Sequence, residues 1–203
     1  SATADVGSKK KKGPANETQP IDLCALAINL GCTFVARSFS GSKKQLTSIL
    51  KAAMSHKGFA LIDVISPCVT FNNNDESMRS YGYVKENEIT LHMADYIPHF
   101  NPMVEIEVPE GHYRDITLHD GSTIRLETIS DEHDPSNAVA ALTALHEAEA
   151  GKKHVTGLLY FDATKPSLAE DLGLVDQALV DVSDEALRPD RASLDALNAE
   201  FLA

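Results

Sequence analysis

Residues 20–66 alternate helical and strand patterns, and this alternation restricts the fold more than any other feature of the chain. The predicted elements are a helix from Asp22, which is a fair N-cap, to Gly31, a strand at 33–36, a helix from Ser42 to Gly58 and a strand at 59–65. Helices and strands that alternate with short connections are typical of a parallel α/β sheet.

The strand at 59–65 reads Phe-Ala-Leu-Ile-Asp-Val-Ile, and this apolar run predicts a strand covered on both faces. Two strands cannot form a stable, doubly covered sheet. We therefore expect the remaining strands to come from a missing N-terminal part or from another chain.

The sequence pattern changes after residue 70. The elements predicted there are a short helix over 75–81, a β-hairpin over 114–129 that turns at Asp120-Gly121, an Ala-rich helix over 136–151 capped by Ser136 or Asp134, and a strand at 154–161. The fold class is thus α/β, with parallel-sheet units followed by a mixed extension that contains a hairpin and a helix.

Composition excludes several classes of protein. Apolar residues are 43% and charged residues 24% of the 203, as in ordinary globular proteins. The formal net charge of −12 speaks against general nucleic-acid binding, and no apolar run is long enough to cross a membrane. We expect no signal peptide and, with three cysteines, no disulfide framework, so the cytoplasm is the default location.

The charge is unevenly distributed along the chain. Residues 1–57 carry nine basic and three acidic residues, whereas residues 58–203 carry nine basic and 27 acidic residues. The basic part includes the run Lys9–Lys12, which could contact phosphate or an acidic protein. It could equally be a mobile surface loop beside an acidic, solvated tail.

Cys68 is the best candidate for a functional residue. It follows Ser66 and Pro67 directly after the strand at 59–65, and ligands of open α/β sheets gather at the carboxyl ends of the strands. A buried structural thiol is the alternative. Cys24 and Cys32 are interpreted as core residues, because one lies within a helix and the other in a helix-to-strand turn.

Arg37 is a weaker candidate, at the end of the strand at 33–36. Its position suits contact with an anion, and a structural ion pair is equally compatible with it. No P-loop, GxGxxG, HExxH or GxSxG motif occurs, and no two histidines stand three or four residues apart.

Two motifs resemble those of a known family. Phe34-Val35-Ala36-Arg37-Ser38-Phe39-Ser40-Gly41 and Ser66-Pro67-Cys68-Val69-Thr70-Phe71-Asn72 are similar to motifs of the beta subunit of 2-oxoacid:ferredoxin oxidoreductases, most of all the 2-oxoglutarate type. The opening Ser1-Ala2-Thr3-Ala4-Asp5 resembles the loop after the thiamin-site Asn. Segments 118–122 and 156–160 resemble the C-terminal extension of that subunit.

The resemblance implies a site and a reaction. The family's beta subunit binds thiamin diphosphate with Mg²⁺, and four cysteines bind one [4Fe-4S] cluster. The fourth of these lies in the Ser-Pro-Cys motif, here Cys68, and thiolate is the ligand that such clusters need. The resemblance implies that a 2-oxoacid, 2-oxoglutarate for the type that the motifs match best, is decarboxylated. Coenzyme A would take the acyl group and ferredoxin the electrons, or the reaction would run in reverse.

The chain departs from the family pattern in one respect. The Gly-Asp-Gly-Asp thiamin motif, its downstream Asn and the other three cluster cysteines are absent. The resemblance therefore implies a C-terminal part of a beta subunit, inactive alone, whose partners are the missing N-terminal part of that subunit and an alpha subunit. Residues 1–20 would be a loop near the cofactor site, 21–72 the end of the thiamin diphosphate-binding domain, and 73–203 a C-terminal extension with an acidic tail. A non-catalytic interaction domain derived from that subunit is the alternative.

Overall fold

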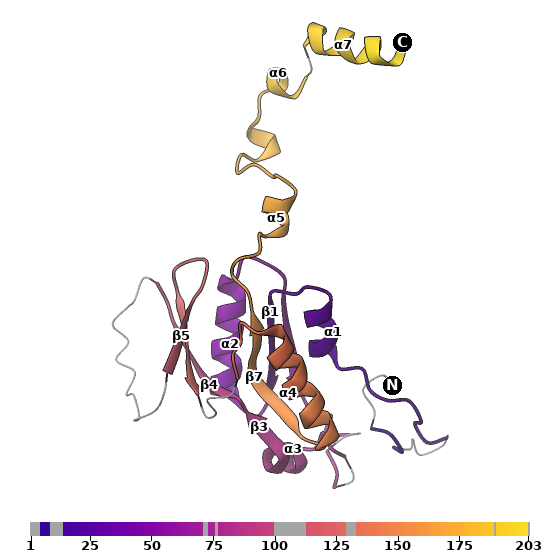
Figure 1. Ribbon diagram of the computed structural model, residues 1–203, viewed down its shortest axis with the longest axis vertical. Coiled ribbons are helices and arrows are strands. Elements are labelled where there is room, and N and C mark those ends of the chain that lie inside the picture. The colour runs from indigo at the N-terminus through magenta and orange to yellow at the C-terminus, as the bar shows by residue number, and fades with distance from the viewer. Residues whose placement is uncertain are drawn as a thin grey trace. The chain divides into compact units, whose positions relative to one another are not determined.

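The computed structural model describes residues 5–8, 14–70, 73–75, 77–99, 113–128, 133–188 and 190–202 (Figure 1). The chain divides into two units, residues 1–167 and residues 168–203. The first unit contains two β-sheets and their helices. The run Lys9–Lys12 lies outside the described residues.

The alternating segment folds as its pattern predicts. Its elements are α1 (Leu23–Asn29), β1 (Phe34–Phe39), α2 (Lys43–Ser55) and β2 (Ala60–Ile65). The Asp22 side chain caps α1 by accepting a hydrogen bond from the Ala25 amide at 2.9 Å. β1 and β2 pair in parallel, with Phe34 opposite Ala60 and Phe39 opposite Ile65.

The rest of this sheet corrects one expectation. The strand order is β2-β1-β7-β3, so the second neighbour of β1 is a strand of the same chain rather than of a missing part. That neighbour, β7 (His154–Phe161), runs antiparallel to β1, and β3 (Glu88–Thr90) pairs in parallel with β7. More than a hundred residues separate β1 from β7, and local patterns do not encode a pairing over that distance.

β2 is less covered than its sequence predicts. All six residues of β1 are buried, whereas those of β2 are half-buried or exposed. The reason is position, because β2 is an edge strand of the sheet and β1 is an inner strand. Its outer edge has no strand partner within the described parts of the chain.

Helices cover both faces of β1. On one face, α1 and α4 (Ala138–Ala150) pack against the sheet through one apolar cluster, and α2 packs on the other face through a second (Figure 1). The first cluster includes Cys24, Ala27, Val35, Leu145 and Leu159, and the second includes Phe34, Ile49, Ala52, Leu158 and Phe161. Cys24 and Cys32 are both buried, which confirms them as core residues.

The second sheet has the order β4-β6-β5, and it contains the predicted hairpin. Its strands are β4 (His92–Ile97), β5 (Tyr113–Thr117) and β6 (Thr123–Thr128), all antiparallel. At the turn, Gly121 has a φ of +80°, which glycine adopts without strain. Ala94, Ile124 and Leu126 of this sheet pack in the same cluster as α2, so α2 lies between the two sheets.

Two local expectations are wrong. The described residues between 75 and 80 are not helical, contrary to the predicted helix over 75–81. α3 (Tyr81–Asn87) begins where that helix was expected to end, because Ser80 caps it by accepting a hydrogen bond from the Tyr83 amide. The cap of α4 is Asn137, whose side chain accepts from two amides of the first turn. The two predicted caps, Asp134 and Ser136, instead bond to each other: the Asp134 carboxylate accepts hydrogen bonds from the amide and the hydroxyl of Ser136.

The second unit consists of short helices. These are α5 (Leu168–Asp171), the 3-10 helix η1 (Leu179–Asp181), α6 (Asp184–Leu187) and α7 (Arg191–Leu202). None of the described helices in either unit is long and apolar enough to cross a membrane.

His56 is a buried histidine that the sequence did not single out. Its Nε2 lies 2.6 Å from Thr33 Oγ1, and its ring contacts those of Phe34, Phe161 and His119. Burial lowers the pKa of His56, and the nearby His119 lowers it further, while Asp162 acts in the opposite direction. The folded protein therefore holds this imidazole neutral over a range in which the unfolded chain binds a proton.

We predict that the free energy of unfolding decreases as the pH falls below 6.5, the ordinary pKa of histidine. The full stability is present above that pH, because there the unfolded chain also keeps His56 neutral. His56→Gln should reduce this pH dependence in urea unfolding curves recorded between about pH 5 and about pH 8. The exposed His146 provides the control, since His146→Gln should leave the dependence unchanged. Equal slopes for His56→Gln and the parent would contradict the assignment.

Candidate functional site

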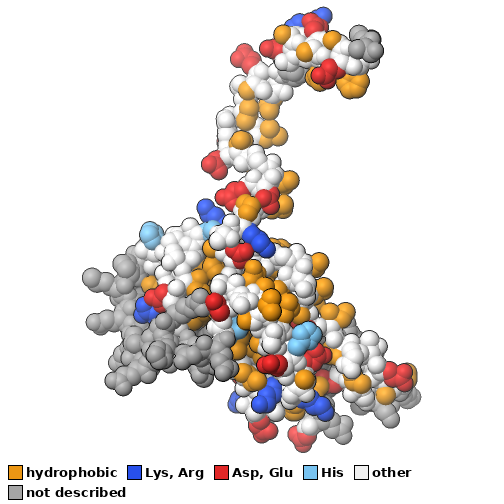
Figure 2. All heavy atoms as spheres, in the orientation of Figure 1, with side chains coloured by type: hydrophobic (Ala, Val, Ile, Leu, Met, Phe, Trp, Pro, Cys, Tyr) orange, Lys and Arg blue, Asp and Glu red, His pale blue; other side chains and the backbone are white. Residues whose placement is uncertain are grey.

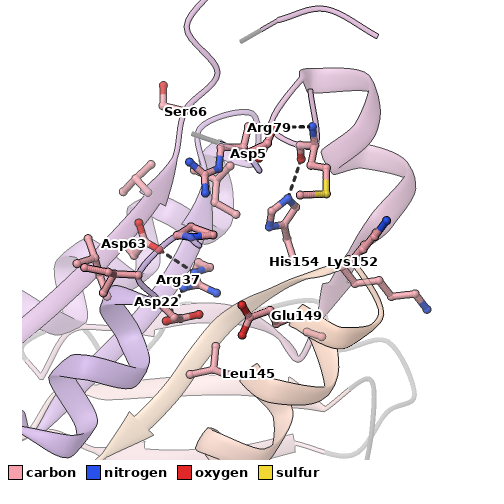
Figure 3. Close-up of a pocket in the computed structure, with 18 residues that line it drawn as sticks. Asp5, Asp22, Arg37, Asp63, Ser66, Arg79, Leu145, Glu149, Lys152 and His154 are labelled. Atoms are coloured by element: carbon pink, nitrogen blue, oxygen red, sulfur yellow. Dashed lines mark hydrogen bonds and ion pairs between the residues drawn. The ribbon is translucent and has the colours of Figure 1, made fainter. Parts of the chain in front are cut away.

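A cavity of about 300 Å³ lies beside β1 and β2 (Figure 3). Its walls come from five parts of the chain: the N-terminal segment, the start of α1, the two strands, the turn before α3, and the junction of α4 with β7. The polar lining residues are Asp5, Asp22, Arg37, Asp63, Ser66, Arg79, Glu149, Lys152, Lys153 and His154.

Arg37 is the centre of one wall. Its Nη2 donates to Asp22 Oδ1 at 2.9 Å and its Nε donates to Asp63 Oδ2 at 2.8 Å (Figure 3). The Arg37 side chain is only 11% exposed, and both carboxylates are less than a third exposed. Of the two roles open from the sequence, the structure shows the ion pair.

The electrostatics of Arg37 follow from this arrangement. Burial alone lowers the pKa of the guanidinium, but the Cys24 sulfur and the carboxylates of Asp22 and Asp63 more than offset it and hold the pKa above its ordinary value. Burial raises the pKa of the Cys24 thiol to about 12, so this cysteine is a neutral core thiol at neutral pH. Its Sγ lies 3.8 Å from the Ala36 carbonyl oxygen.

His154 lies on the opposite wall, at the first position of β7. Its Nε2 is 2.7 Å from the Met78 carbonyl oxygen, which can only accept, so Nε2 carries a proton. Burial lowers the pKa of His154, while the bond to Met78 acts in the opposite direction. A neutral ring in this tautomer has Nδ1 as a hydrogen-bond acceptor.

Asp5 attaches the N-terminal segment to this wall. Its carboxylate accepts hydrogen bonds from the Met78 amide at 3.2 Å and from Ser77 Oγ at 3.4 Å. Asn16 donates to the backbone oxygen of Asp5 at 3.3 Å. The segment around Asp5 is therefore held against residues 77–79, next to the ends of the two strands.

Cys68 differs from the other two cysteines in its exposure to solvent. Cys68 is exposed and is not among the residues that line the cavity, although Ser66 of the same motif is. Cys32 is buried, with its Sγ 3.0 Å from the Phe59 carbonyl oxygen. Within the described residues, no group of three His, Cys, Asp or Glu side chains could hold a metal ion.

Sequence reasoning did not predict several residues of this site. Arg37 was a candidate, but its partner Asp63 was not. The two residues stand directly opposite each other in the parallel register, so one charged residue in each of two neighbouring apolar strands was a usable signal for the pair. His154 and the Met78 carbonyl are 76 residues apart, and no local pattern brings them together.

Residues 2–64 match the family of thiamine pyrophosphate enzymes, C-terminal TPP binding domain. The chain is 40% identical over 106 residues to the 2-oxoacid:ferredoxin oxidoreductase subunit beta of Saccharolobus solfataricus, over 52% of this chain and 32% of that one. It is 35% identical over 99 residues to the 2-oxoglutarate synthase subunit KorB of Methanocaldococcus jannaschii, over 46% of this chain and 37% of that one.

The chain resembles the beta subunits of 2-oxoacid:ferredoxin oxidoreductases. This confirms the resemblance that the two motifs predict. The chain spans about a third of the length of these relatives.

A solved structure shows the same fold. The 2-oxoglutarate:ferredoxin oxidoreductase from Magnetococcus marinus, with 2-oxoglutarate, coenzyme A and succinyl-CoA bound, matches with a TM-score of 0.54 and 23% identity. The match covers 90% of this chain and 46% of that one. It confirms the predicted fold class, which is mixed α/β with a parallel-sheet segment.

We predict that Arg37→Met destabilises the protein by about 3 kcal/mol, because it leaves two partly buried carboxylates without a cation. Arg125→Met is the matched control. Arg125 also bonds an aspartate at two points, but Asp115 is well exposed, so the expected loss is below about 1 kcal/mol. Urea unfolding at neutral pH measures both. Similar losses for the two variants would show that Arg37 does not act as a buried ionic link.

Proposed function

We propose that this chain forms part of the beta subunit of a 2-oxoacid:ferredoxin oxidoreductase of the 2-oxoglutarate type. The complex would convert 2-oxoglutarate and coenzyme A to succinyl-CoA and CO₂, pass the electrons to ferredoxin, and be able to run in reverse. One observation carries this proposal. The family match over residues 2–64 coincides with α1, β1, α2 and β2, which include the strands beside the cavity.

The thiamin diphosphate site would be completed outside this chain. The sequence has no Gly-Asp-Gly-Asp motif to hold the diphosphate and Mg²⁺. What this chain contributes is a wall, with Asp5 held against residues 77–79 and with a neutral His154 beside it. When bound, thiamin diphosphate supplies the carbanion chemistry that cleaves a 2-oxoacid.

The [4Fe-4S] cluster needs four thiolates, and this chain can supply one. Cys24 and Cys32 are buried and contact backbone carbonyl oxygens, whereas Cys68 is exposed. An exposed thiol after the end of a sheet strand can reach a ligand shared with another part of the complex. The assignment of Cys68 as that ligand rests on its place in the Ser-Pro-Cys motif.

The alternative is a non-catalytic interaction domain derived from the same subunit. The acidic C-terminal segment favours it, since residues 168–203 contain nine acidic and two basic residues. The two proposals differ in what they require of the intact complex. If this chain is only an interaction domain, neither the iron content nor the thiamin-dependent activity of the complex depends on it.

We expect the native complex to give a reduced [4Fe-4S] signal in anaerobic EPR only after 2-oxoglutarate and coenzyme A are added. Cys68→Ser should lower the iron content and slow ferredoxin reduction by about tenfold or more, because a cluster ligand is lost. Cys24→Ala is the control, a buried thiol whose removal should leave the iron content unchanged. Unchanged iron in Cys68→Ser would refute the ligand assignment, and a complex without the substrate-dependent signal would favour the interaction domain.

The open edge of β2 is where we expect the missing N-terminal part of the beta subunit to bind. Phe59 and Val64 are exposed there, and Leu30 of the neighbouring segment is 79% exposed. An uncovered apolar strand edge binds further strands readily. Adding the N-terminal part should therefore slow hydrogen exchange of the outward amides of residues 60–65 by about tenfold or more. The amides of β1 serve as the control, since that strand is already paired on both sides. Unchanged exchange in β2 would place the partner elsewhere.

A further inference from the structure

Arg79 differs from the other arginines of the chain in its contacts. Arg37, Arg125, Arg188 and Arg191 each form an ion pair with an aspartate. Among the arginines whose side chains the structure describes, only Arg79 forms neither an ion pair nor a side-chain hydrogen bond. It is half-buried and lines the cavity of about 300 Å³ beside β1 and β2. Its guanidinium therefore keeps five N–H donors for a ligand.

The turn that carries Arg79 is held by three hydrogen bonds. The Met78 amide donates to Asp5 at 3.2 Å, and the Met78 carbonyl oxygen accepts from His154 Nε2 at 2.7 Å. The Arg79 amide donates to Ser77 Oγ at 3.2 Å. The backbone position of Arg79 is thus set within the chain itself, so a ligand has to order only the side chain. Such preorganisation reduces the free energy that binding costs.

The lining of the cavity has no excess of either charge. It contains four cationic side chains and four carboxylates. Figure 2 shows the same mixture on one face of the molecule, where basic and acidic side chains lie beside each other near α3 and the end of α4. Arg37 is already bonded to Asp22 and Asp63. A negative group is therefore favoured at one place in the cavity, next to the unpaired guanidinium, rather than by the total charge.

The potential between Arg79 and His154 is positive. Arg37 and Arg79 each lower the pKa of His154 more strongly than Asp5 raises it, which is the effect of nearby positive charge. The Asp5 carboxylate accepts hydrogen bonds from the Met78 amide and Ser77 Oγ, and these two described residues, Asp5 and Arg79, form no ion pair. An anion between Arg79 and His154 would thus be attracted by charge that the chain does not neutralise.

The size and the remaining lining indicate what carries the negative group. A cavity of about 300 Å³ is at the small end of the range for ligand sites. In Figure 3, Arg79 and Ser66 lie toward one end of it and Leu145 lies toward the other. Ile21 and Leu23 add further apolar surface to the lining. A guanidinium binds a carboxylate through two parallel hydrogen bonds, and apolar walls suit a short carbon chain.

We propose that this cavity binds the carboxylate of a small organic acid, with Arg79 as the residue that contacts it. His154 and Asp5 act through the turn that they hold in place. The proposal concerns binding by this chain and does not rest on the proposed function, although the 2-oxoacid of that function belongs to the same class of ligand.

The test measures binding to the full chain by isothermal titration calorimetry at constant ionic strength. The probes are glutarate, the uncharged glutaramide of similar size, and inorganic phosphate. We expect the parent to bind glutarate more tightly than phosphate and not to bind glutaramide. Arg79→Gln should raise the Kd for glutarate about tenfold or more, and Arg79→Lys, which keeps the charge without the fork, should raise it less.

Lys85→Gln is the matched control, because Lys85 is an exposed cation of α3 that does not line the cavity. It should change the Kd less than about twofold, and the Tm of Arg79→Gln should equal that of the parent. Equal glutarate binding by Arg79→Gln and the parent would overturn the proposal, as would a parent that does not bind glutarate. Tighter binding of phosphate than of glutarate would overturn the carboxylate assignment.

The proposal and the proposed function fail in different experiments. Glutarate binding that depends on Arg79 supports the proposal even where the complex gives no substrate-dependent EPR signal. An active complex whose chain does not bind glutarate overturns the proposal alone.

Discussion

The first unit depends on β1, a strand that is buried on both faces and carries one charged residue, Arg37. A fully buried strand in a sheet holds few polar side chains, yet Arg37 lies in its middle. The guanidinium is compatible with that position because Asp22 and Asp63 accept from it at 2.9 and 2.8 Å. One residue thereby fixes the start of α1 and the register of β2 relative to β1. The cavity opens beside this ionic link, so its shape follows from the same contact.

The sequence predicted the helices, strands and turns that have local sequence patterns. The two helices and two strands of residues 20–66 and the turn at Gly121 all have short-range signals, and the structure has them. The motif resemblance also predicted the family similarity that the comparisons confirm. In the candidate site, Arg37 was identified as a candidate, with its role left open between an anion contact and an ion pair.

What the sequence did not predict depends on contacts between distant residues. The pairing of β7 with β1 extends the sheet to four strands of the same chain. These two strands are more than a hundred residues apart in the sequence. The same holds for His154 with Met78 and for His56 with His119, because each pair comes from separate elements. The start of α3 is a different case. Asp75 and Ser80 are both residue types that cap helices. The helix begins after Ser80, whose side chain accepts a hydrogen bond from the Tyr83 amide, and the local sequence pattern does not distinguish the two positions.

Apolar side chains are exposed both at the open edge of β2 and in the second unit. Each exposes apolar side chains that gain free energy only when another surface covers them. A protein that binds partners through such surfaces becomes more stable as the partner concentration rises, since ligands that bind only the folded state shift the folding equilibrium toward it. Arg37 and the two apolar clusters hold β1, β2 and β7 together without a partner, whereas the outer edge of β2 and the second unit leave apolar side chains exposed. Assembly therefore acts on the edges of this fold, while the cavity wall built around Arg37 is formed within the chain itself.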